Sequence, residues 1–208
     1  MSINGGEVVS GLRERQKEQR REAILVAAID LFDKNGYSAT TVEQVAAAAG
    51  VSSPTVFNYF GSKQEILFAL VDRADRAAVS RARLRRPQFD NAIDALCNLN
   101  AVIMESELAT LPISIWRELM TFSLQSPISA GLSLFDQYLA EEAAELLRDL
   151  QARGLVRADV DASFVANFLN DHCILLFAKY VQQEAPDMNA HLAHVRQLAE
   201  LVFVGLKP

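Results

Sequence analysis

The stretch from Thr40 to Lys63, TTVEQVAAAAGVSSPTVFNYFGSK, decides the fold of this chain. Its apolar residues recur at helical spacing on both sides of Gly50, and Gly61 ends the second segment. The alanines at 46–49 are small enough to let a neighbouring helix approach closely. Two short helices joined by a tight glycine turn are typical of a helix-turn-helix, in which the second helix enters a groove of DNA.

Residues that begin helices accompany both segments. Thr40 or Thr41 is expected to cap the first helix, because Thr40 and Glu43 have the spacing of a capping box. One of the serines at 52–53 is expected to cap the second helix, with Pro54 in its first turn, where a missing N–H costs nothing.

A further helix is predicted on each side of the motif. Upstream, an apolar stripe ends near Asn35 and Gly36 suits the left-handed residue that follows a helix, whereas residues 1–12 are expected to be disordered. Downstream, Ser62 and Glu65 form a second capping box that opens a long helix.

The remainder of the chain predicts five more helices and no strands, because no alternating apolar pattern survives in it. Their expected spans are 89–107, 110–125, 128–153, 160–184 and 188–205. The fold class is therefore all-α with about nine helices. We divide the chain into a helix-turn-helix domain at 13–64 and a larger helical domain at 65–208.

The net charge of −6 conceals an uneven distribution. Residues 1–86 hold 13 Lys and Arg against 10 Asp and Glu, whereas residues 87–208 hold 7 against 16. Affinity for DNA depends on the patch that meets the phosphates rather than on the total charge. The charge therefore permits DNA binding in the first part of the chain without demonstrating it.

Several other classes of protein are disfavoured. The most apolar stretch, 164–181, contains polar residues that argue against a membrane span, and residues 1–22 do not resemble a signal peptide, so a cytoplasmic location is expected. Cys97 and Cys173 lie in apolar patterns, so neither a disulfide nor a redox site is expected. The sequence shows no phosphate-cradling glycine loop and no nucleophile elbow, so we expect neither an enzyme nor a cofactor. His191 and His194 lack the further ligands of a metal site.

The segment that begins at the paired serines has the residues needed to read DNA. Short polar side chains lie at its N-terminal end, where the helix dipole also favours phosphate, and a proline offers an apolar surface to a thymine methyl group. Flanking groups are placed to hold phosphates and so fix the register. The predicted DNA-contacting residues are Thr40, Thr41, Ser52, Ser53, Pro54, Thr55, Phe57, Asn58, Tyr59 and Lys63. Val51, Val56 and Phe60 are better interpreted as core, and Phe57 suits either role.

Residues 20–70 resemble the N-terminal domain of the TetR family of transcriptional regulators. The matching string is AAIDLFDKNGYSATTVEQVAAAAGVSSPTVFNYFGSKQEIL, and the resemblance over residues 20–70 covers about a quarter of the chain. The resemblance implies DNA contact by Thr41, Ser53, Pro54, Thr55, Phe57, Asn58, Tyr59 and Lys63. This chain has Asn58 where the family often has an aromatic residue and Tyr59 where it often has histidine, so the operator does not carry over.

The resemblance also implies that the second domain binds a ligand and forms a dimer. The segment 164–181 is apolar almost all round, so one of its faces needs a partner, and the last helix offers a second apolar stripe. The predicted dimer-interface residues are Phe168, Leu175, Leu176, Val195, Ala199 and Val202. The alternative is that both helices complete a monomeric core.

A ligand pocket is predicted from aromatic and soft residues with a few polar anchors. Such stripes are more often ordinary core, but a mostly apolar pocket of this kind suits a neutral or aromatic ligand. The residues are Met104, Trp116, Met120, Phe122, Phe135, Tyr138, Asn170, His172 and Phe177.

Together these features predict a homodimeric regulator that binds a pseudo-palindromic operator on double-stranded DNA. We expect a repressor that a small molecule releases, with the long helix after Ser62 carrying the change, although nothing in the sequence distinguishes repression from activation. The alternative is a helical ligand-binding or interaction protein without DNA activity.

Overall fold

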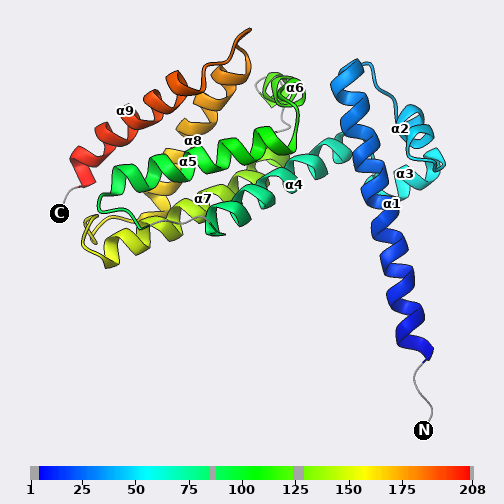
Figure 1. Cartoon of the computed structure of the whole chain (residues 1–208), viewed down its shortest axis with the longest axis horizontal. Coiled ribbons are helices and arrows are strands. Elements are labelled where there is room, and N and C mark those ends of the chain that lie inside the picture. Colours follow the sequence, from blue (N-terminus) through cyan, green and yellow to red (C-terminus); the bar gives the residue numbers. More distant parts are fainter. Residues whose placement is uncertain (1–4, 85–87, 124–128, 207–208) are drawn as a thin grey trace. The chain divides into compact units, whose positions relative to one another are not determined.

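The computed structural model describes residues 5–84, 88–123 and 129–206, and its side chains at 13–84, 88–121 and 137–204. Within these residues the chain forms nine α-helices and no strand, as predicted for the all-α class (Figure 1). The helices are α1 (Gly5–Asn35), α2 (Val42–Ala48), α3 (Ser53–Phe60), α4 (Lys63–Leu84), α5 (Ala92–Thr110), α6 (Ile113–Ser123), α7 (Ser129–Ala152), α8 (Ala162–Val181) and α9 (Met188–Leu206). None of the described helices has the length and apolar character needed to cross a membrane.

The chain divides into two compact units between Leu70 and Val71, within α4. In the first unit, α2 packs against both α1 and α3. Its core is formed by fully buried apolar side chains from α1 to α4, among them Ile24, Phe32, Val45, Val56 and Ile66. The predicted apolar stripe of α1 therefore faces the core, and α1 begins at Gly5 rather than after residue 12, so the expected disorder is wrong for 5–12. A helix that is already nucleated gains one hydrogen bond for each residue added, which lets it extend.

The turn between α2 and α3 explains why glycine is required there. Gly50 has a backbone φ of 67°, a value that residues with a side chain rarely adopt. The N–H of Val51 donates to the carbonyl of Ala46 at 2.9 Å and that of Gly50 to Ala47 at 3.2 Å, the pattern of a Schellman motif. These bonds satisfy the last carbonyls of α2 and set the direction in which the chain enters α3.

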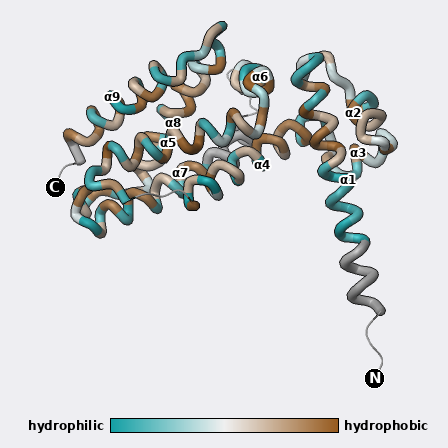
Figure 2. Tube along the Cα trace, viewed as in Figure 1, coloured by the Kyte–Doolittle hydropathy of each residue, from teal (hydrophilic) through white to brown (hydrophobic). Residues whose placement is uncertain are grey.

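In the second unit, α7 packs against α8 and α9 packs against both α5 and α8. Figure 2 shows apolar and polar residues alternating along these helices, as expected for amphipathic helices in a bundle. The apolar sides meet in one buried cluster that includes Leu99, Leu147, Leu150, Ala166 and Phe203.

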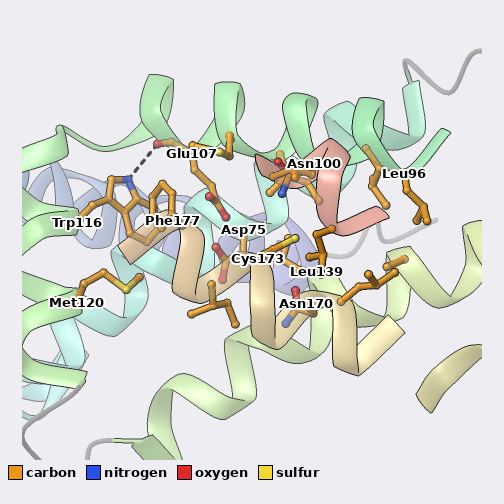
Figure 3. Close-up of a pocket in the computed structure, with 18 of the residues that line it drawn as sticks. Asp75, Leu96, Asn100, Glu107, Trp116, Met120, Leu139, Asn170, Cys173 and Phe177 are labelled. Atoms are coloured by element: carbon orange, nitrogen blue, oxygen red, sulfur yellow. Dashed lines mark hydrogen bonds between the residues drawn. The ribbon is translucent and has the colours of Figure 1, made fainter. Parts of the chain in front are cut away.

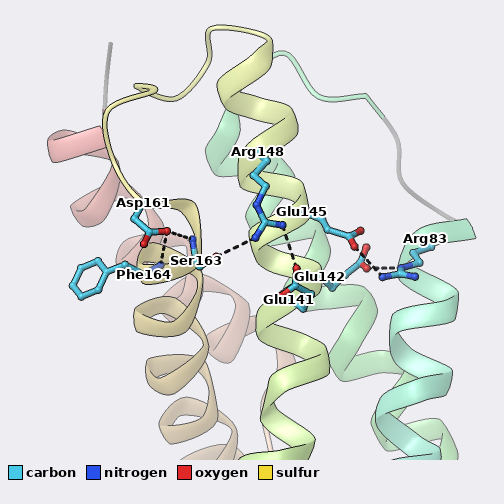
Figure 4. A network of polar contacts seen from close by, with 8 residues as sticks. All are labelled: Arg83, Glu141, Glu142, Glu145, Arg148, Asp161, Ser163 and Phe164. Atoms are coloured by element: carbon cyan, nitrogen blue, oxygen red, sulfur yellow. Dashed lines mark hydrogen bonds and ion pairs between the residues drawn. The ribbon is translucent and has the colours of Figure 1, made fainter.

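Polar contacts join helices at one end of this bundle (Figure 4). The guanidinium of Arg83 on α4 donates to the Glu142 carboxylate on α7 at 2.6 Å, and the Glu142 side chain is fully buried. Arg148 on α7 donates to the hydroxyl of Ser163 on α8 at 3.0 Å. Asp161 caps α8 by accepting from the N–H groups of Ser163 and Phe164.

Candidate nucleic-acid interface and ligand pocket

Helix α3 presents one exposed face and one buried face. Val56 and Phe60 are buried, as predicted, and fix the helix to its unit. Pro54, Phe57 and Asn58 are exposed and lie at positions i, i+3 and i+4, so they share the opposite side. Phe57 is 47% exposed, which resolves its two possible roles in favour of the surface.

The polar residues at the start of α3 are arranged by a cap. Ser52, rather than Ser53, is the N-cap: its hydroxyl accepts from the N–H of Thr55 at 3.3 Å and lies 2.8 Å from the Thr55 hydroxyl. Ser52 is exposed, whereas Ser53, Thr55 and Tyr59 are half-buried at the edges of the exposed face. The N-terminal end of α3 therefore offers hydroxyl groups and helix N–H groups, the features that suit contact with DNA.

Two of the predicted phosphate contacts, Thr40 and Lys63, have structural roles, and Thr40 is the first of them. Thr40 is 1% exposed, and its hydroxyl donates to the carbonyls of Gly36 at 2.8 Å and Leu31 at 3.2 Å. A side chain that is buried and already bonded does not reach a phosphate, so we correct the prediction for Thr40.

The capping box of α2 also lies one residue later than predicted. Thr41 caps α2 and pairs with Gln44, whose side chain accepts from the Thr41 N–H at 2.8 Å.

Lys63 is bonded inside its unit. Its ammonium donates to the carbonyls of Tyr37 at 2.7 Å and Thr40 at 2.8 Å, and lies within 3.4 Å of that of Ser38. An ammonium has three N–H donors, so these carbonyls use its full capacity. The half-buried Lys63 thus holds the segment between α1 and α2, and a phosphate would have to displace one of these bonds.

A pocket lies within the second unit, where α4 to α9 supply its walls (Figure 3). Its volume is about 120 Å³. Five predicted pocket residues line it, namely Met104, Trp116, Met120, Asn170 and Phe177. Trp116 and Phe177 meet edge to face with their ring centroids 5.2 Å apart, and the indole N–H donates to the carbonyl of Glu107 at 3.3 Å.

Two predicted pocket residues lie elsewhere. His172 is exposed on α8, because it is two residues, or about 200° of helical rotation, from the pocket-lining Asn170. Tyr138 is 38% exposed and instead receives a hydrogen bond from Arg76, whose guanidinium lies 4.5 Å from its ring centroid. The predicted Phe122 and Phe135 lie outside the described side chains.

Sequence reasoning missed the pocket's polar residues Asp75, Asn100 and Glu107. Asp75 and Glu107 are 3% and 6% exposed. A signal for two of them was present in the sequence, because Leu96, Asn100 and Glu107 fall at i, i+4 and i+11 on the apolar side of α5. Cys173 also lines the pocket, and burial raises the pKa of its thiol to about 11, which disfavours the reactive thiolate.

Helices α8 and α9 carry apolar side chains on their exposed sides. Phe164, Phe168 and Leu175 on α8 are 70%, 49% and 51% exposed, and Leu201 and Val204 on α9 are each 74% exposed. We call these five residues the α8–α9 apolar face. Exposed apolar side chains of this size make these residues candidates for a site of association.

Four predicted dimer-interface residues are less exposed than expected. Val195 and Ala199 are 5% and 3% exposed and line the pocket, because they lie on the inner side of α9. Val202 packs against the buried cluster, and Leu176 is half-buried. The prediction for Val195 and Ala199 is therefore corrected, whereas Phe168 and Leu175 remain candidates.

Comparisons with known proteins agree with this geometry. Residues 24–70 match the family model described as bacterial regulatory proteins, tetR family. The chain is 28% identical over 166 residues to the HTH-type transcriptional regulator TcmR of Streptomyces glaucescens, covering 76% of this chain and 70% of that protein. It is 26% identical over 160 residues to the HTH-type transcriptional repressor NicS of Pseudomonas putida, covering 73% and 72%.

A solved structure shares the fold over most of the chain. It is that of Thermus thermophilus FadR, a TetR-family transcriptional repressor in complex with lauroyl-CoA, with a TM-score of 0.69 and 23% identity. The similarity covers 88% of this chain and 93% of that one.

Proposed function

The chain belongs to the TetR family of transcriptional regulators, and from that premise we propose that it is a dimeric repressor released from a palindromic operator by a small molecule. The exposed face of α3 carries this proposal. Pro54, Phe57 and Asn58 project from a helix whose other side is fixed by Val56 and Phe60. An aromatic and an amide side chain exposed on an otherwise well-packed short helix are suited to base edges rather than to the core.

Fewer residues are proposed to contact DNA from this geometry than were predicted from the sequence. We assign base contact to Pro54, Phe57 and Asn58, and backbone or edge contact to Thr41, Ser52, Ser53, Thr55 and Tyr59. Thr40 and Lys63 instead hold the segment that leads into α2.

The α8–α9 apolar face supports the dimer. Two copies that meet through this face would bury its five large side chains, and a two-fold interface uses the same surface on both protomers. A symmetric pair would present two α3 helices to half-sites about one helical turn of DNA apart, or a multiple of it.

Release by a ligand is supported by the pocket and by relatives. NicS is named a repressor, and FadR was solved with lauroyl-CoA. In this chain α4 contributes Val71 and Asp75 to the pocket and begins at Lys63 in the first unit. A ligand that binds the released form about a hundredfold more tightly would shift the equilibrium by about 2.7 kcal/mol.

Selection of bound fragments from random double-stranded DNA tests the proposal. The full chain is expected to enrich a two-fold-symmetric site, and the enriched fragment placed upstream of a reporter should lower its expression. An asymmetric site would contradict the dimer assignment. Failure to enrich any sequence, together with no retention on heparin at low salt, would contradict DNA binding.

A further inference from the structure

Helix α1 runs on past the body of the first unit. The match to the family model begins at residue 24, and Ile24 is the first buried side chain of α1 among those described, whereas α1 itself begins at Gly5. The described side chains at 13–20 are all exposed. Figure 1 shows this part of α1 extending past α2 and α3 toward the N-terminus. These side chains add little to the core of their unit, so they are available to a partner.

The charged residues of this segment form two columns of like sign. Each column has one residue at every fourth position; the basic one is Arg13, Lys17 and Arg21, and the acidic one beside it is Glu14, Glu18 and Glu22. Like charges at i and i+4 repel and destabilise a helix, whereas opposite charges at this spacing stabilise it. The two ion pairs that join the columns, at 4.0 and 3.9 Å, are long and exposed, so they compensate little. This order of charges therefore suits an external anion better than it suits the isolated helix.

The basic side of the segment continues the buried side of α1. Arg13, Lys17 and Arg20 lie eleven, seven and four residues before the buried Ile24, which are spacings of residues that share one side of a helix. We call Arg13, Lys17, Arg20 and Arg21 the α1 basic face. Because Ile24 faces the core of the first unit, this face is turned toward the side of α1 on which the rest of that unit lies.

The α1 basic face begins beside the end of α3. The guanidinium of Arg21 lies 5.3 Å from the centroid of the ring of Phe60, the last residue of α3. At 1.5 Å per residue, Arg13 lies about 12 Å further along the axis of α1. Within the described part of the chain, the side chains of Arg13 and Arg20 have neither an ion pair nor a hydrogen bond, so both charges are free for another group.

A duplex that receives α3 would bring phosphates to this face. The major groove is about 8.5 Å deep, so the phosphates at its edges rise beside a helix that lies in it. A row of cations that starts at the end of α3 and runs on for about 12 Å is placed to meet such an edge. Arginine and lysine are also the side chains that neutralise phosphates most often.

We propose that the α1 basic face is a second DNA-binding surface, which holds phosphates of the duplex next to the groove that α3 reads. It contributes affinity without base preference, because phosphates carry no direct sequence information. The assignment rests on the proposed function in that α3 must dock on DNA.

Salt titration of DNA binding tests this surface. The variant combines Arg13→Gln, Lys17→Gln and Arg20→Gln and keeps Arg21, which packs on Phe60. Binding of the full-length protein is followed by fluorescence anisotropy on the fragment selected from random DNA and on an unrelated duplex of equal length. Because each phosphate contact contributes about 0.9, the slope of log K against log salt should lose about 2–3 units of its magnitude on both duplexes. Affinity at low salt should fall at least about tenfold on both, with the ratio between them unchanged.

A pair of single variants locates the effect on one side of the helix. Arg20→Gln should reduce the magnitude of the slope by about 0.9, whereas Arg15→Gln should change it by less than about half a unit. Arg15 is exposed in the same segment but lies two residues, or about 200° of helical rotation, from Arg13. Circular dichroism establishes that each variant is folded.

An unchanged slope in the combined variant would overturn the assignment. A loss confined to the selected fragment, or an equal change in Arg15→Gln and Arg20→Gln, would overturn it as well, since neither fits phosphate contact by one face. If the wild type binds the selected fragment and the combined variant keeps its slope, this assignment alone fails. A wild-type protein that binds neither duplex contradicts the regulator proposal together with this one.

Discussion

The ammonium of Lys63 lies 4.4 Å from the centroid of the Tyr37 ring and donates to the Tyr37 carbonyl at 2.7 Å. One side chain therefore combines a cation–π contact with hydrogen bonds to the segment between α1 and α2. Replacing Lys63 by Met keeps the apolar stem and removes these bonds. We expect a loss of about 1–3 kcal/mol in the free energy of unfolding, measured by urea denaturation.

The salt dependence of DNA binding distinguishes anchoring from phosphate contact at this position. If Lys63 only holds the segment between α1 and α2, the slope of log K against log salt in Lys63→Met should stay within about half a unit of the wild-type slope. Loss of one phosphate contact would instead reduce the magnitude of this slope by about 0.9. Lys34→Met, at an exposed lysine that pairs with Asp30, serves as control. A full unit of change would restore the original phosphate assignment for Lys63.

Asn58 is expected to discriminate between bases. Asn58→Ala should weaken binding to the selected operator by about 1–3 kcal/mol and relax base preference at one position of each half-site, since an amide pairs well with adenine. Affinity for unrelated DNA should change little. Fluorescence anisotropy on the operator and its single-base variants measures both effects, with Asn189→Ala in the exposed first turn of α9 as control. An equal loss on every sequence would show that Asn58 holds the backbone instead.

The α8–α9 apolar face is expected to hold the dimer. Phe168→Asp places a charge at a side chain that is 49% exposed in the single chain, so it should leave the protomer folded and shift it to monomer in sedimentation velocity. Val26→Asp makes the same kind of change at another exposed apolar residue, on α1, and should leave the dimer unchanged. A wild-type protein that sediments as a monomer at micromolar concentration would contradict the interface.

The contact between Arg83 and the buried Glu142 should matter more than a similar contact at the surface. Arg83→Met removes the guanidinium from a fully buried carboxylate, which we expect to lower the free energy of unfolding measurably. Arg148→Met removes a partner of Glu141, whose side chain is 61% exposed, and should cost less than about 1 kcal/mol. Equal losses in thermal or chemical unfolding would show that burial of the acid does not decide the effect.

Stability is expected to fall in mild acid through His191. Burial, together with the nearby His194, holds the pKa of His191 below its ordinary value of about 6.5. The unfolded chain therefore binds this proton at a higher pH than the folded one. The contribution of neutral His191 to the free energy of unfolding is fully present above about pH 6.5. It is lost as the pH falls toward the depressed pKa, by at most about 1.4 kcal/mol per pH unit.

Urea unfolding at pH 7.5, 6.5 and 5.5 measures this loss. His191→Gln should be less sensitive to pH than the wild type, whereas His194→Gln, at an exposed position, should retain most of the slope. Identical slopes in all three proteins would assign the acid sensitivity to other groups.

Local patterns predicted most of the helices and the orientation of α3, because each depends on residues close in sequence. Val56 and Phe60 were expected to be core and are buried. The capping box of α2 was placed one residue too early, since Thr40 and Thr41 both suit a cap and only the hydrogen bonds to the carbonyls of Leu31 and Gly36 show that the Thr40 hydroxyl is already used.

Features that depend on distant residues were harder to predict. α9 is apolar on two sides, so periodicity alone does not show that Val195 lies inward and Leu201 outward. The carboxylates of Asp75 and Glu107 were missed because acidic residues on helices usually face water. Their burial depends on how α4 and α5 pack within the second unit, which no local pattern encodes.

Helices α2 and α3 have only 7 and 8 residues, well below the roughly 12–15 that an isolated helix needs in water. Their shape is thus supplied by neighbours, through anchors such as Val56 and Phe60. A synthetic peptide with the sequence of α3 alone would be a random coil and a poor ligand for any promoter. Helix α3 could therefore not be moved alone into another protein. Its exposed residues can be exchanged one at a time, but the helix keeps its conformation only together with the helices that support it.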